Sequence, residues 1–105
     1  MELTPQEAAD RLAAGDAELV DVREPYEFEA GHIEGARHVP LPELAAFAQT
    51  LERGRAVVFV CRVGGRSAMA TGAFRRAGFD AYNLAGGMLA WERSGLPFTG
   101  SVAPH

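Results

Sequence analysis

Hydrophobic residues recur along the chain at two spacings, one typical of helices and one typical of buried strands. A helix is expected near the N-terminus, where Thr4, Pro5 and Glu7 form a capping box with proline at the first helical position. Apolar residues three or four positions apart predict further helices in 41–54, 66–78 and 87–95. Short apolar runs between them predict strands in 17–23, 36–40, 56–60 and 80–85.

The strand expected in 56–60 has no polar alternation, so we expect it to be buried on both faces, as in a parallel sheet. Strands that alternate with helices indicate an α/β fold. No internal repeat and no linker divides the sequence, so residues 1–105 are expected to form one domain. Residues 96–105 are expected either to pack over the sheet or to fray. In the helix 66–78, the residues expected to face the core are Ala70, Ala73, Phe74 and Ala77.

Charge, hydropathy and cysteine content indicate which partners, cofactors and cellular location to expect. The formal net charge of −4 disfavours nucleic acid as a partner, since phosphate binding needs a basic surface. The longest apolar run, 56–61, is too short to span a membrane, and the acidic N-terminus does not resemble a signal peptide, so a cytoplasmic location is expected. A single cysteine excludes an internal disulfide, and the sequence shows no metal-ligand spacing and no nucleotide-binding fingerprint, so neither metal nor cofactor is expected.

The single cysteine, Cys61, stands where ligands bind in open α/β sheets, directly after a strand. In the loop that follows, Gly64 and Gly65 can take positive φ, so that peptide N–H groups converge on the sulfur. The next helix begins nearby, and Arg62 and Arg66 add positive charge. All of these features stabilise an anion, so we expect Cys61 to be an ionised nucleophile at neutral pH rather than a small core hydrophobe.

Three stretches, in this order and spacing, resemble the single-domain rhodanese family of sulfurtransferases. They are VDVREPYEFEAGHIEGARHVP at 20–40, CRVGGRS at 61–67 and NLAGGMLAW at 83–91. The resemblance covers nearly the whole chain. It implies an α/β fold with a central, mostly parallel five-stranded sheet and helices on both faces.

The resemblance also implies chemistry at Cys61, which would carry a persulfide during turnover. Family members that move sulfur have a six-residue loop, whereas their phosphatase and arsenate-reducing relatives have seven residues. The loop here has six, from Cys61 to Arg66. The expected donor is thiosulfate or another small sulfur anion, and the expected acceptor is cyanide or a thiol. The loop residues expected to bind substrate and stabilise the persulfide are Arg62, Val63, Gly64, Gly65, Arg66 and Ser67.

Individual roles differ within this site. Arg62 is expected to attract the anionic donor. Arg66 either faces the substrate or holds the loop through a carboxylate such as Asp21, and the structural role is favoured. Asp21 and Arg23 lie at the end of a strand near the site in the resembled fold, and Ser67 is expected to be the N-cap of the following helix.

Three other functions stay open beside sulfur transfer to a small acceptor. The chain could carry a persulfide between proteins, taking sulfur from a protein donor. It could be a binding module without catalysis, which the intact Cys61 loop disfavours, or a cysteine-dependent phosphatase, which the loop length disfavours. The remaining conspicuous residues have structural interpretations: a hydrogen-bonded His32, a turn at Gly86 and Gly87, and core positions for Met88 and Trp91.

Overall fold

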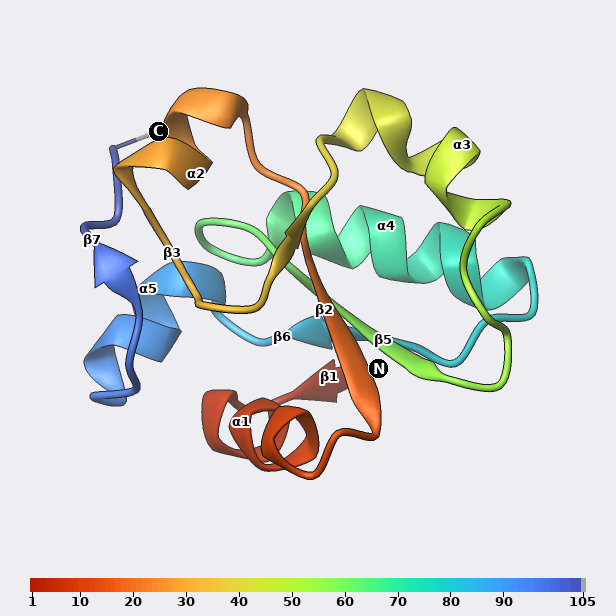
Figure 1. The fold of residues 1–105 in the computed structure, drawn as a ribbon, viewed down its shortest axis with the longest axis horizontal. Helices are drawn as coiled ribbons and strands as arrows, with labels where there is room; N and C mark the ends of the chain where they lie inside the picture. Colours follow the sequence, from red (N-terminus) through yellow and green to blue (C-terminus); the bar gives the residue numbers. More distant parts are fainter. Residues whose placement is uncertain (105) are drawn as a thin grey trace.

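The computed structural model describes residues 1–104, and its centre is a five-stranded parallel sheet (Figure 1). The strand order is β1-β6-β5-β2-β4, and every pairing in this sheet is parallel. The strands are β1 (Glu2–Leu3), β2 (Ala17–Asp21), β4 (Arg37–His38), β5 (Ala56–Val60) and β6 (Ala81–Leu84). The α/β fold with a central parallel sheet is therefore confirmed.

Helices cover both faces of this sheet. The helical segments are α1 (Pro5–Ala13), α2 (Pro25–Ala30), the short 3-10 helix η1 (Leu41–Glu43), α3 (Leu44–Ala48), α4 (Gly65–Arg76) and α5 (Gly87–Arg93). Side chains of α3 and α4 share one hydrophobic cluster with the sheet, and side chains of α1 and α5 share the other. The capping box expected at Thr4 is present, with hydrogen bonds in both directions between Thr4 and Glu7.

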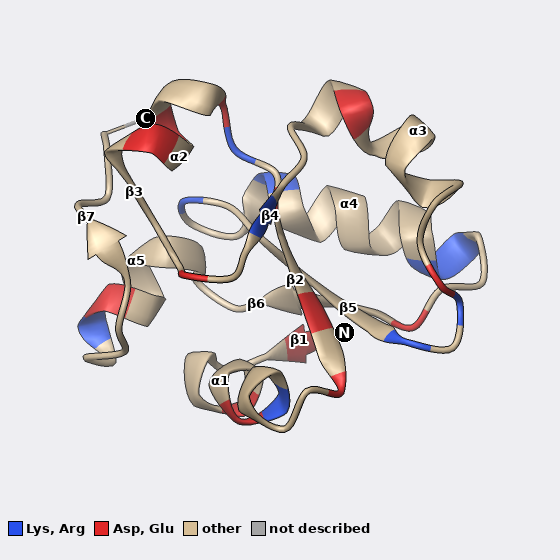
Figure 2. Cartoon of the chain, in the orientation of Figure 1, with Lys and Arg blue, Asp and Glu red and all other residues tan. Residues whose placement is uncertain are grey.

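Strand β5 lies at the centre of the core, and all five of its residues are buried. Val57 and Phe59 point into the cluster of α3 and α4, whereas Val58 and Val60 point into the cluster of α1 and α5. In Figure 2 the strand carries no charged residue, and arginines lie just beyond both of its ends. Burial on both faces explains why its sequence lacks polar alternation. The core positions predicted for Met88 and Trp91 are also confirmed.

Some elements escape prediction because they are very short. Strand β1 has two residues and precedes the capping box of α1. Strand β3 (Gly31–His32) pairs antiparallel with β7 (Thr99–Gly100) in a second, two-stranded sheet. This pairing decides between the two alternatives for the C-terminal segment, which packs on the molecule rather than fraying; its last residue, 105, lies outside the described residues.

Two helix predictions need correction. The helix expected in 41–54 ends at Ala48, because the Gln49 and Thr50 N–H groups bond three residues back and close the last turn. In α4, Ala73 and Ala77 are exposed. The face turned to the core consists of Ser67, Ala70, Thr71 and Phe74. This face contains two hydroxyl residues, which an apolar periodicity does not identify.

Candidate active site

Cys61 lies at the carboxyl end of β5 and is almost fully buried, with 1% of its surface exposed. The Gly64 N–H donates to its Sγ at 3.1 Å, and the Ser67 N–H donates to it at 3.4 Å. Gly64 has a φ of +107°, a conformation that L side chains rarely adopt, and it turns the chain into α4. The loop thus directs peptide dipoles at the sulfur, as expected. Of the two glycines, however, only Gly64 has a positive φ, because Gly65 is already the first residue of α4.

Ser67 has a different place from the one predicted. The N-cap of α4 is Gly64, and Ser67 is a fully buried residue of the first turn. Its Oγ lies 3.2 Å from Cys61 Sγ and 2.6 Å from Asn83 Oδ1. The helix starts earlier than the sequence suggests, because glycine at φ > 0 replaces a side-chain cap. The Ser67 hydroxyl is therefore available to the sulfur instead of to the helix terminus.

The first turn of α5 supports the loop from the opposite side. The Met88 N–H donates to the Cys61 carbonyl at 2.8 Å, and the Leu89 N–H donates to the Arg62 carbonyl at 3.1 Å. Gly86 and Gly87 both have positive φ, which confirms the predicted turn. A Cβ added at Gly87 would collide with the Cys61 and Arg62 backbone. The turn must therefore be free of side chains for the loop to lie against it.

Arg66 holds the loop to α2. Its Nη1 and Nη2 donate to the two carboxylate oxygens of Glu27, at 2.7 and 2.9 Å. Glu27 is fully buried, and its Oε1 also accepts from the Glu24 N–H at 2.9 Å. Burial opposes ionisation of Glu27, but the hydrogen bonds from Arg66 and Glu24 and the charges of Arg66 and Arg23 outweigh it and hold its pKa below the usual value. The hydrogen bonds from Glu27 in turn raise the pKa of Arg66.

The favoured structural role of Arg66 thus has geometric support, but the partner expected for it was wrong. Asp21 does not bond Arg66, because it is paired with Arg23, whose Nε and Nη2 donate to the Asp21 carboxylate at 2.8–3.1 Å. Both side chains are fully buried, and Arg23 also donates to the Gly31 carbonyl at 2.8 Å. Asp21 aligns with Val60 in the sheet, so the pair lies beside the end of β5. Among the described residues, the side-chain hydrogen bonds of the pair reach Gly31 of β3 and not the loop.

Arg62 and Val63 complete the loop on its outer side. The Nε of Arg62 donates to the carbonyl of Ala103 at 3.1 Å, so the C-terminal segment fixes one side of its guanidinium. Val63 is 56% exposed. On β3, the predicted structural role of His32 is confirmed, since its Nδ1 lies 2.8 Å from the Phe28 carbonyl and its ring stacks on Phe28.

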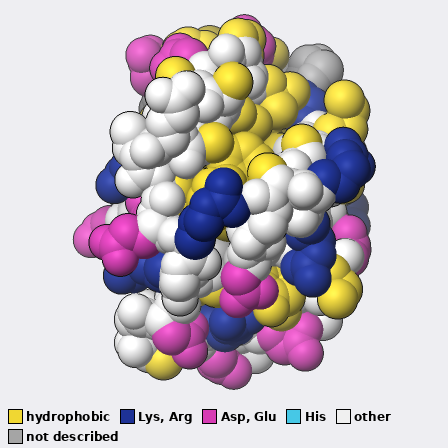
Figure 3. All heavy atoms as spheres, turned by 90° about the vertical axis from the view of Figure 1, so that its right-hand side faces the viewer, with side chains coloured by type: hydrophobic (Ala, Val, Ile, Leu, Met, Phe, Trp, Pro, Cys, Tyr) yellow, Lys and Arg dark blue, Asp and Glu magenta, His cyan; other side chains and the backbone are white. Residues whose placement is uncertain are grey.

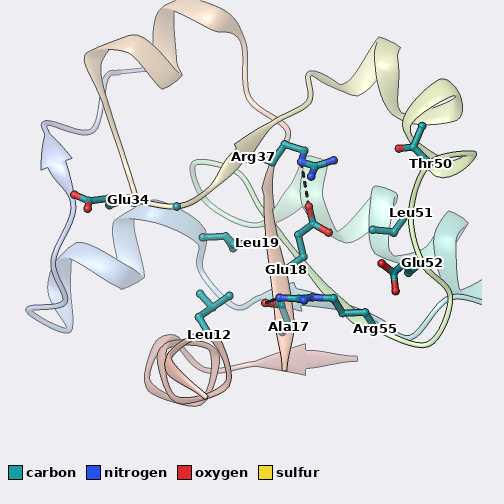
Figure 4. A pocket seen from close by; sticks show the side chains of 11 residues that line it. Leu12, Ala17, Glu18, Leu19, Glu34, Arg37, Thr50, Leu51, Glu52 and Arg55 are labelled. Carbon is teal, nitrogen blue, oxygen red and sulfur yellow. Dashed lines mark hydrogen bonds and ion pairs between the residues drawn. The ribbon is translucent and has the colours of Figure 1, made fainter. Parts of the chain in front are cut away.

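Two cavities differ in size and in distance from the sulfur. The first, about 240 Å³, is lined by Cys61, Arg62, Val63, Gly65 and Arg66, and it suits a small anion. The second, about 540 Å³, includes Glu18 and Arg37, which form an ion pair at 3.1 Å (Figure 4). It lies by the first residues of β2, at the end of the strands opposite Cys61. We place the candidate site in the smaller cavity, because the cysteine and both loop arginines are there.

Figure 3 shows the side with α3 and the carboxyl end of α4, where hydrophobic side chains are interrupted by single charged ones. Within residues 1–104, no group of three or more His, Cys, Asp or Glu side chains could hold a metal ion. In the same part of the chain, no helix is long and apolar enough to cross a membrane.

Comparison with known proteins gives the same family as the motifs. The family model of the rhodanese-like domain matches residues 4–94. The thiosulfate sulfurtransferase GlpE of Pseudomonas aeruginosa (strain LESB58) is 37% identical over 87 residues, which cover 82% of this chain and 79% of GlpE. A sulfurtransferase of Allochromatium vinosum is 36% identical over 106 residues, covering 99% of this chain and 96% of that protein.

Longer relatives and solved structures extend this comparison. The probable adenylyltransferase/sulfurtransferase MoeZ of Mycobacterium tuberculosis is 39% identical over 99 residues, but the chain spans only 25% of its length. The crystal structure of a rhodanese-related protein from Thermoplasma volcanium superposes with a TM-score of 0.86 at 26% identity, covering 95% of this chain and 98% of that one. The chain belongs to the rhodanese-like domain family, and two relatives that it matches over most of their length are named sulfurtransferases.

Proposed function

We propose that this chain transfers a sulfane sulfur from thiosulfate, or a related small anion, to cyanide or a thiol through a persulfide on Cys61. The observation that carries the proposal is the geometry at the sulfur. The Gly64 N–H of the six-residue loop and the Ser67 N–H of the following first helical turn point at Cys61 Sγ, which lines a cavity together with two arginines. A thiolate surrounded in this way is a nucleophile that needs no general base.

The reaction divides into two substitutions at sulfur. The Cys61 thiolate attacks the outer sulfur of thiosulfate, a new S–S bond forms, and the S–S bond of thiosulfate breaks. Sulfite leaves with the electron pair, and the enzyme holds Cys61–S–S⁻. An acceptor then attacks the terminal sulfur, giving thiocyanate from cyanide or a persulfide from a thiol, and the Cys61 thiolate is regenerated. The terminal anion lies among the loop N–H groups, which stabilise it as an oxyanion hole does.

Each arginine has a separate part in this proposal. Arg62 is held at Nε by Ala103, which leaves the other side of its guanidinium to draw the anionic donor toward the cavity. Both terminal nitrogens of Arg66 are bound to Glu27, so Arg66 holds the loop in place. Its positive charge still acts on the anion in the cavity, but its guanidinium is not free to bind the donor in a bidentate way. A single cysteine forces sulfur to leave to an external acceptor, because the chain cannot resolve the persulfide as a disulfide.

The test combines a kinetic and a mass measurement. Cys61→Ser should abolish thiocyanate formation from thiosulfate and cyanide, whereas Ser94→Ala, which removes an exposed hydroxyl at the end of α5, should leave it unchanged. Thiosulfate alone should load the wild type with one sulfur atom, a gain of roughly 32 Da in intact mass, and cyanide should return the original mass. Substantial turnover by Cys61→Ser would refute the mechanism.

A second candidate is transfer between proteins. It is favoured by the similarity to MoeZ, of which this chain matches only a part. On this hypothesis a protein persulfide loads Cys61 and thiosulfate does not, so the two donors are compared in the mass assay. Hydrolysis of an aryl phosphate without sulfur loading would instead indicate a phosphatase. Loading by neither donor, without hydrolysis, would indicate a binding module.

A further inference from the structure

A chain of hydrogen bonds runs from the catalytic sulfur, through buried Ser67 and Asn83, to the exposed Glu2 at the edge of the sheet. Asn83, on β6, has both of its amide hydrogens engaged: Nδ2 donates to Glu2 Oε2 at 2.7 Å and to the Gly64 carbonyl at 3.2 Å. Both partners are acceptors only, so the orientation of the amide is fixed by them. Asn83 therefore turns its oxygen, and not its nitrogen, toward Ser67. Asn83 and Ser67 are both buried.

The fixed amide decides what the Ser67 hydroxyl can do. A serine hydroxyl has one hydrogen, and Ser67 Oγ is in reach of two acceptors, Asn83 Oδ1 at 2.6 Å and Cys61 Sγ at 3.2 Å. While that hydrogen is given to Asn83, Ser67 offers only a lone pair to the sulfur, which suits a neutral thiol that donates its own hydrogen. When Cys61 ionises, the hydroxyl must leave Asn83 Oδ1 unpaired in order to reach the anion. A buried acceptor without a donor is costly.

We propose that Asn83 is a positioning residue that competes with Cys61 for the Ser67 hydroxyl and so weakens the stabilisation of the thiolate by the loop. The effect on the reaction follows from charge location. A less stabilised thiolate is a better nucleophile, because a thiolate becomes less nucleophilic as it becomes less basic. Once sulfur is bound, the charge moves to the outer atom, and the hydroxyl can return to Asn83 without loss. Asn83 and Ser67 together thus favour the transfer of sulfur to Cys61 over the resting thiolate.

The test follows alkylation of Cys61 by iodoacetamide against pH. Asn83→Leu keeps the side-chain shape and removes the competing oxygen, so the Ser67 hydroxyl is free for the sulfur. We expect the midpoint of the alkylation curve to fall by about one pH unit, the effect of one hydrogen bond to a charged group. The limiting rate at high pH should fall about threefold, as the more stable anion is less nucleophilic.

The control is a double variant. In a Ser67→Ala background Asn83 has no hydroxyl to compete for. The double variant Ser67→Ala, Asn83→Leu should therefore have the same alkylation midpoint as Ser67→Ala alone. Tyr82→Phe, on the neighbouring residue of β6, should match the wild type. None of these variants replaces a charged group near the sulfur; these groups are Arg62, Arg66 with Glu27 on α2, the Asp21–Arg23 pair at the end of β2, and Glu2 on β1. Asn83→Leu also removes the Nδ2 donor to Glu2, and the double variant with Ser67→Ala controls for this loss because it shares it.

The inference would be overturned if Asn83→Leu left the alkylation midpoint unchanged. It would also be overturned if Asn83→Leu shifted the midpoint equally in the wild type and in the Ser67→Ala background. If Asn83→Leu folds poorly, Asn83→Ala also removes the amide oxygen and carries the same expectations. The inference concerns the nucleophile of the proposed function, but alkylation needs no sulfur donor. Absence of thiosulfate turnover would therefore count against the proposed function alone, and an unmoved midpoint against the role of Asn83 alone.

Discussion

Replacing Glu27 by glutamine tests what holds the loop in place. Glu27 is fully buried and accepts two hydrogen bonds from Arg66 and one from the Glu24 N–H. Removing one partner of a buried ion pair costs roughly 3–5 kcal/mol. Two features reduce this figure: the Arg66 side chain is 22% exposed and can reach water, and glutamine keeps one acceptor. We therefore expect Glu27→Gln to lower the free energy of unfolding by about 2–3 kcal/mol at pH 7.

The matched control is the exposed pair at the other end of the sheet. Glu18→Gln breaks its contact with Arg37, whose side chain is 56% exposed, and should cost less than about 1 kcal/mol. Urea unfolding followed by circular dichroism gives both values, provided that the slope against urea is unchanged. Equal costs in the two variants would refute the argument that burial makes the Glu27–Arg66 pair important.

The same pair predicts how stability depends on pH. The pKa of Glu27 is lower in the folded chain than its reference value of 4.5, so the unfolded state binds its proton first as pH falls. The stabilisation by this carboxylate is fully present above the unfolded pKa and is lost as pH falls through the folded one. The difference between wild type and Glu27→Gln should therefore be constant near neutrality and shrink below about pH 4.5. A difference that grows with acid would contradict the direction of the shift.

Two further substitutions probe the loop. Arg62→Met should raise KM for thiosulfate about tenfold with a smaller change in kcat, since one charged hydrogen bond to the donor is lost. The control Arg93→Met, at the end of α5, should change neither constant. A fall in kcat alone in Arg62→Met would argue against a donor-binding role for Arg62. Gly87→Ala adds a collision with the Cys61 carbonyl to the strain of positive φ, so it should cost clearly more than the roughly 1–3 kcal/mol of strain alone. Gly95→Ala, at a similar φ with open space around it, supplies that baseline in the same urea assay, and equal costs would show that the loop does not need the close approach.

Prediction from sequence succeeded where one residue type or one periodicity decides the structure. The apolar run of β5, the capping box at Thr4 and the positive φ of Gly64 each have one physical interpretation, and each lies where it was expected. Gly65, for which a positive φ was also expected, is instead the first residue of α4. It failed where the partner is far away in sequence. Thr99 pairs with His32 across 67 residues, and no local pattern announces a two-residue strand.

Glu27 shows why the partners of a buried charge are hard to predict from sequence alone. It stands in the stretch PYEFEA, where two glutamates alternate with aromatic residues and no helix was predicted, yet it is the carboxylate that Arg66 reaches. Asp21, the partner that was expected, is taken by Arg23 two residues later, an arrangement that only the bend after β2 makes possible. Two buried carboxylates and two arginines allow more than one pairing, and the choice depends on the path of the backbone between them.

Asn83 shows that the fold also decides which acceptors compete for one hydrogen-bond donor. Its sequence neighbours place it on a strand, and although it opens the family stretch NLAGGMLAW, no local periodicity indicates a contact with a residue of the Cys61 loop more than fifteen positions away. The fold brings it to Ser67 because β6 lies beside β5 and α4 packs over both strands. The loop motif alone suggests that every group near the sulfur stabilises an anion. A fixed amide oxygen opposes that, because it claims the one hydrogen that Ser67 can give. The reactivity of Cys61 therefore depends on a residue outside the loop, through a choice that the loop sequence does not contain.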